Sequence, residues 1–70
     1  MKYHEQVEPY IKRFGRITNS DIIDITHTSC PHQVVKTLRT KGVLKKEEEE
    51  NSEEIVHLGN GKWYKIYFAR

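Results

Sequence analysis

The chain has 70 residues, of which 36% are hydrophobic and 31% are charged, and its formal net charge is +2. A chain of this length forms one small domain, which buries only about 60% of the surface of its unfolded state. With one cysteine it can form no internal disulfide, and its sequence has neither a signal-peptide pattern nor the roughly 20 apolar residues in a row that a membrane helix needs. We therefore expect a cytoplasmic domain, stabilised by packing or by an oligomer.

The charges are unevenly distributed along the chain. Residues 1–46 carry nine lysines and arginines against four acidic residues, and residues 55–70 add three basic residues. Between them, residues 47–54 carry six glutamates and no basic residue. The chain is a basic body interrupted by an acidic segment, and this asymmetry indicates a charged partner.

Apolar side chains at a helical spacing predict a first helix over residues 5–14. Because Pro9 lacks an N–H, this helix either begins near residues 5–6 or is kinked at Pro9. Gly15 is expected to cap the helix, and Arg16-Ile17 to form a short extended link able to make one sheet pairing.

The second helix is predicted over residues 19–26, since Thr18 and Asp21 have the spacing of a capping box. We expect its inward side chains to be Ile22, Ile23 and Ile25, with a turn at His27-Thr28.

The third helix has a signal at each end and is predicted over residues 30–41. Ser29 is a suitable N-cap, Pro31 suits the first turn, and Gly42 ends the helix. Its buried side is expected to consist of Pro31, Val34, Val35 and Leu38.

A β-hairpin is predicted after the helices, over residues 43–68. Val43–Lys46 opens a strand, Ile55–Leu58 is a second extended run, and Gly59–Gly61 allows a tight reversal into the strand Lys62–Phe68. The order of three helices and a hairpin predicts an α+β fold of the winged helix-turn-helix type.

The aromatic residues of the last strand alternate between its two faces. We expect Tyr64 and Phe68 to fill the core and Trp63 and Tyr67, on the other face, to be available for a dimer or a partner.

The polar side of the third helix suits nucleic acid. At 100° per residue, the outward positions are Ser29, Gln33, Lys36, Thr37 and Thr40. Gln can pair with adenine, Lys can donate to guanine or phosphate, and hydroxyls can donate to phosphates. We expect Lys41 and Arg16 to contact phosphates as well, whereas Arg39 either touches DNA or supports the hairpin.

The acidic segment argues against DNA binding, because carboxylates repel the phosphate backbone. It is either a solvated loop, a docking site for a basic protein surface, or a mimic of the charge of DNA. The residues concerned are Glu47, Glu48, Glu49, Glu50, Glu53 and Glu54.

No catalytic, metal or cofactor site is expected. His27, Cys30 and His32 lack the number and spacing of ligands that zinc requires. No nucleophile and base can be paired in so small a domain.

The chain resembles the small winged helix-turn-helix proteins of bacteriophages. The motifs that carry the resemblance are Gly15-x-Ile17-Thr18, Ser29, Val35-x-x-Leu38-Arg39-x-x-Gly42 and Asn60-Gly61-Lys62 before an aromatic strand. It implies a compact winged helix that binds DNA through its third helix. Cys30, in place of a basic residue, and the acidic segment depart from that pattern. Lys41-Gly42-Val43-Leu44 and Trp63 are similar to winged domains that bind left-handed nucleic acid.

The sequence thus predicts a phage or prophage transcriptional regulator that binds duplex DNA and is not an enzyme. A homodimer is expected, because a single domain makes few contacts with DNA. The alternative is an interaction protein that inhibits a host protein through its acidic segment.

Overall fold

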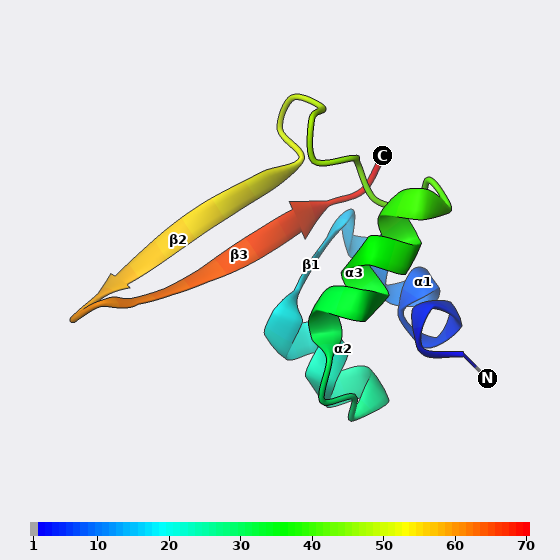
Figure 1. Ribbon diagram of the computed structural model, residues 1–70, viewed down its shortest axis with the longest axis horizontal. Coiled ribbons are helices and arrows are strands. Elements are labelled where there is room, and N and C mark those ends of the chain that lie inside the picture. Colours follow the sequence, from blue (N-terminus) through cyan, green and yellow to red (C-terminus); the bar gives the residue numbers. More distant parts are fainter. Residues whose placement is uncertain (1) are drawn as a thin grey trace.

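The computed structural model describes residues 2–70 and has an α+β fold, as predicted. Its elements are α1 (Tyr3–Phe14), β1 (Arg16–Thr18), α2 (Asn19–Thr26), α3 (Pro31–Thr40), β2 (Glu53–Gly59) and β3 (Lys62–Phe68). The strands form one antiparallel sheet in the order β1-β3-β2. The three helices gather at one end of this sheet, and the β2–β3 hairpin extends away from them (Figure 1). Within residues 2–70, no helix has the length and apolar character needed to cross a membrane.

Helix α1 begins at Tyr3, two residues before its predicted start. Pro9 therefore lies inside the helix and not in its first turn. The end of the helix agrees with the prediction: Gly15 has φ 73° and its N–H donates to the Ile11 carbonyl at 2.7 Å. Arg16 and its neighbours then form β1, so the extended link does pair with the sheet.

Helix α2 is held by the predicted capping box. The Asp21 N–H donates to Thr18 Oγ1, and the Thr18 N–H donates to Asp21 Oδ2, both at 3.1 Å. Ile22 is fully buried, but Ile23 is 43% exposed, so the expectation that Ile23 faces inward was wrong. Ile23 follows Ile22 and is therefore rotated about 100° from it about the helix axis, away from the core. The residue one turn after Ile22, Thr26, is the other buried residue of this helix.

The core lies where the helices meet the base of the sheet. Its buried side chains come from all three helices and from the strands and loops beside them: Val7, Ile11, Ile17, Ile22, Val34, Val35, Leu38, Leu44 and Tyr67. Tyr67 is 4% exposed and Tyr64 38%, so the prediction for the two faces of this strand was wrong. Ile17 on β1 faces the helices, and its register partner Tyr67 must project to the same side.

The segment 41–52, which we call the α3–β2 loop, differs from the prediction. Residues 43–46 form no strand; Leu44 makes a single bridge to Ala69 and is fully buried. Strand β2 begins at Glu53, inside the acidic segment. The turn agrees with the prediction, since Asn60 and Gly61 have φ 53° and 77°, as a type I′ turn requires.

Candidate nucleic-acid interface

Helix α3 begins at Pro31 and ends at Thr40, one residue inside each predicted end. Its N-cap is Cys30 and not Ser29, and the Cys30 side chain makes no capping hydrogen bond with the described residues. The chain enters this helix through hydroxyl contacts, because the Cys30 N–H donates to Thr28 Oγ1 at 3.1 Å. At the other end the Val43 N–H donates to the Leu38 carbonyl at 3.0 Å, and Gly42 has φ 80°, as in a Schellman motif.

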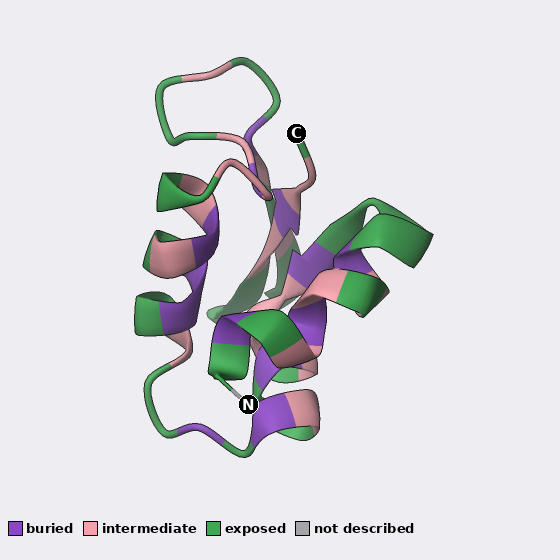
Figure 2. Ribbon diagram, turned by 90° about the vertical axis from the view of Figure 1, so that its right-hand side faces the viewer, coloured by how far each residue is buried: buried purple, intermediate pink, exposed green. Residues whose placement is uncertain are grey.

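The inward side of α3 anchors it firmly. Val34, Val35 and Leu38 are between 0% and 5% exposed, while Pro31 is only half-buried. Figure 2 shows this buried side turned toward the rest of the molecule and the exposed side outward.

The predicted DNA-facing positions of α3 lie on that exposed side. Gln33, Lys36 and Thr40 are exposed, as are the flanking Ser29 and Lys41, and Thr37 is half-buried. Arg16 is apart from them on β1, where its charge acts on the Tyr10 hydroxyl beside Asp21. The structure therefore groups six of the seven predicted residues along one helix and its ends.

The threonine hydroxyls of α3 already have acceptors. Thr37 Oγ1 donates to the Gln33 carbonyl and Thr40 Oγ1 to the Lys36 carbonyl, each at 3.0 Å. Either hydroxyl would have to turn away from its own helix before donating to a phosphate. Of the predicted positions within the helix, Gln33 and Lys36 are consequently the ones whose side-chain donors are available.

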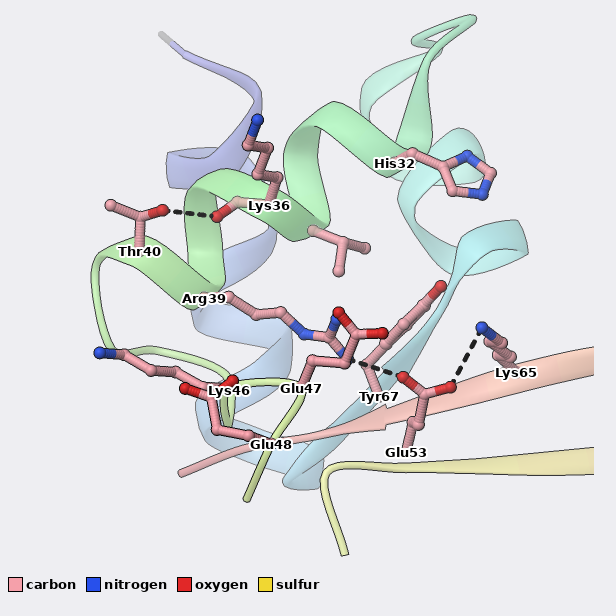
Figure 3. Close-up of a pocket in the computed structure, with 11 residues that line it drawn as sticks. His32, Lys36, Arg39, Thr40, Lys46, Glu47, Glu48, Glu53, Lys65 and Tyr67 are labelled. Atoms are coloured by element: carbon pink, nitrogen blue, oxygen red, sulfur yellow. Dashed lines mark hydrogen bonds and ion pairs between the residues drawn. The ribbon is translucent and has the colours of Figure 1, made fainter. Parts of the chain in front are cut away.

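Arg39 supports the hairpin. Its Nη2 donates to Glu53 Oε1 at 3.0 Å, and its guanidinium carbon lies 5.2 Å from the centroid of the Tyr67 ring. Lys65 Nζ lies 3.1 Å from Glu53 Oε2, so one carboxylate joins a helix to two strands (Figure 3). Hydrogen bonds from Arg39 and then Lys65 lower the pKa of Glu53, and the carboxylate raises the pKa of Lys65.

A cleft of about 570 Å³ lies between α3 and the base of the hairpin. Lys36 and Thr40 line it from the helix, and Glu47 and Glu48 line it from the α3–β2 loop. The acidic segment thus lies beside the C-terminal half of α3, at the base of the hairpin and far from its tip (Figures 1 and 3).

The six glutamates are not equivalent. Glu53 is paired as described, and Glu49 Oε1 lies 3.7 Å from Arg70 Nη2. Among the described residues, no hydrogen bond or ion pair holds the remaining exposed carboxylates, which belong to Glu47, Glu48, Glu50 and Glu54. Sequence patterns did not indicate the role of Glu53, because Arg39 is 14 residues away.

The described residues bring together no group of three or more His, Cys, Asp or Glu side chains able to hold a metal ion. Comparison of the chain with protein-family models, with curated proteins and with solved structures gave no match.

Proposed function

We propose that this chain is a winged helix-turn-helix domain that binds duplex DNA sequence-specifically, with α3 in the major groove. The element order supports a winged helix: helix, strand, two helices and a hairpin, with the sheet order β1-β3-β2. The observation that carries the proposal is the contrast between the two sides of α3. One side is packed into the core, and the other presents the exposed side chains of Gln33 and Lys36 as donors.

Each contact follows from side-chain chemistry. Gln33 can pair with the N6 and N7 atoms of adenine, and Lys36 can donate to guanine or to a phosphate. Ser29, Thr40 and Lys41 lie at the flanks of these two, where phosphates border the groove. The resemblance to phage proteins suggests that the domain regulates transcription.

The test begins with selection of a preferred duplex from a random pool. Its affinity is then measured by fluorescence anisotropy for the native chain and for Gln33→Ala/Lys36→Ala. Loss of two base contacts should weaken binding at least about 30-fold, because each contributes about 1–3 kcal/mol. Lys62→Ala, which removes an exposed charge next to the hairpin turn and not on α3, is the control.

Thermal unfolding of the double variant should match that of the native chain, since both side chains are exposed. Retention of full affinity by this folded variant would refute the proposal. So would an affinity independent of salt, since phosphate contacts release counterions.

A second candidate function is docking to a basic protein surface. It is favoured by the exposed carboxylates of Glu47, Glu48 and Glu50 in the α3–β2 loop, which make no hydrogen bond or ion pair within the described part of the chain. Changing these three to glutamine should strengthen DNA binding if α3 reads DNA, because Glu47 and Glu48 line a cleft with Lys36. The same change should weaken capture of a basic protein partner if docking is the function.

A further inference from the structure

Strand β2 has a free edge. In the order β1-β3-β2 it pairs only with β3, and within residues 2–70 no other element lies beside its outer edge (Figure 1). The opposite edge of the sheet is β1, which is only three residues long. The long free edge of this sheet is therefore β2, with seven residues.

The backbone groups at that edge can be identified from the register. The Phe68 N–H donates to the Ser52 carbonyl at 3.1 Å, so Ser52 directs its carbonyl toward β3. Direction alternates along an antiparallel strand, and the register is regular as far as His57. The N–H and C=O groups of Glu53, Ile55 and His57 consequently point away from β3, toward solvent.

The hairpin also exposes apolar side chains on both faces. Ile55, Leu58, Trp63 and Tyr64 are between 38% and 63% exposed. Edge strands are normally protected by lysine, proline, inward charges or a bulge, yet the stretch 55–57 has none of these, and the bulge of β2 comes after it, between His57 and Gly59. The charge that the strand does carry is confined to its first two residues, Glu53 and Glu54.

We propose that a second copy of this chain pairs antiparallel with β2, with Val56 on the two-fold axis. Val56 is the central residue of the strand, so this register pairs the regular stretch 55–57 with its own copy. Ile55 then faces His57 of the second copy across a hydrogen-bonded pair, and Glu54 faces Leu58. Antiparallel pairing places Glu53 and Glu54 of one copy at the opposite end of the interface from those of the other copy. Parallel pairing would place these like charges next to each other.

The pairing closes on itself. It joins two three-stranded sheets into one of six strands, whose remaining edges are the short β1 strands, so a dimer forms and not a fibre. Residues opposite each other in a ladder project to the same face. Because Arg39 of α3 contacts the face that carries Glu53 and Tyr67, both copies of α3 lie on the same side. This dimer does not depend on what α3 binds.

Cross-linking tests the register. Cys30→Ser first removes the native thiol, and Val56→Cys then places two cysteines across the axis. Their Cα atoms should lie about 4.5 Å apart, within disulfide range, and mild oxidation should give a covalent dimer. Glu54→Cys is the matched control on the same strand. Four residue steps separate its two copies, about 14 Å, so it should remain monomeric. Equal cross-linking at both positions would overturn the proposal.

Sedimentation equilibrium of the unmodified chain tests the association itself. Ile55→Pro removes an N–H that faces the free edge, so the β2–β3 ladder keeps its hydrogen bonds while the partner strand is excluded. This variant should raise the dimer Kd at least about tenfold, whereas Ile55→Thr, which keeps the N–H, should change it less. The highest protein concentration measured is about 200 µM. A native chain that is still monomeric there would overturn the pairing, and so would equal Kd values for the native chain and Ile55→Pro.

Discussion

The bridge made by Glu53 should be the main electrostatic contribution to folding, and Glu53→Gln tests it. The substitution keeps the shape of the side chain but removes the charge between Arg39 and Lys65, whose side chains are 18% and 32% exposed. A hydrogen bond to a charged group contributes about 1.5–3 kcal/mol. Two are weakened here, but partial contact with solvent reduces each. We expect a loss of about 2 kcal/mol.

Urea unfolding at neutral pH, followed by circular dichroism, measures this loss. In a domain of this size about 2 kcal/mol lowers the Tm by roughly 8–16 °C. Glu54→Gln is the matched control, because the Glu54 carboxylate, next to Glu53 in the sequence, is exposed and makes no hydrogen bond or ion pair with any residue of 2–70. The control should change stability by no more than about 0.5 kcal/mol.

The effect should also depend on pH. Arg39 and Lys65 lower the pKa of Glu53, so its stabilisation is complete above the unfolded-state pKa and is lost as the pH falls through the folded-state pKa. The difference between native chain and Glu53→Gln should therefore shrink in acid. A difference that stays constant from neutral pH into acid, or one equal to that of Glu54→Gln, would refute this account.

Three further substitutions test the local structure by urea unfolding. Leu38→Ala removes a fully buried side chain and should cost about 2–5 kcal/mol; a smaller loss would mean that the core is loosely packed. Thr18→Ala breaks the capping box and should cost about 1 kcal/mol, whereas the exposed Ser20→Ala should have little effect. Gly42→Ala should cost about 1–2 kcal/mol because Gly42 has a φ of 80°, which is unfavourable for alanine. A clash does not contribute, since the atom nearest to the new Cβ is at 3.7 Å, an ordinary contact distance.

Much of the secondary structure could be predicted from the sequence, because its signals act over a few residues. The capping box at Thr18, the glycine cap at Gly15 and the Asn60-Gly61 turn depend on neighbours within about four positions. The inward and outward sides of α3 follow from helical periodicity alone. Ser29 shows the limit of such signals. Serine is favoured at N-cap positions, yet the N-cap of α3 is the next residue, Cys30.

Contacts between distant segments could not be predicted in this way. The face on which Tyr67 lies depends on its pairing with Ile17, 50 positions earlier, and the periodicity of β3 cannot say which side meets the helices. The position of Glu53 between Arg39 and Lys65 likewise depends on how α3 packs against the sheet.

The sequence by itself determined where most of the helices and the hairpin turn lie, and which residues α3 exposes. Only the tertiary structure decided what the charges do. It divides the acidic segment into one carboxylate that holds the hairpin to α3, one that pairs with Arg70, and four that make no hydrogen bond or ion pair with residues 2–70. The physical reason is that a charge has a role only relative to its neighbours in space, and residues far apart in the chain supply those neighbours.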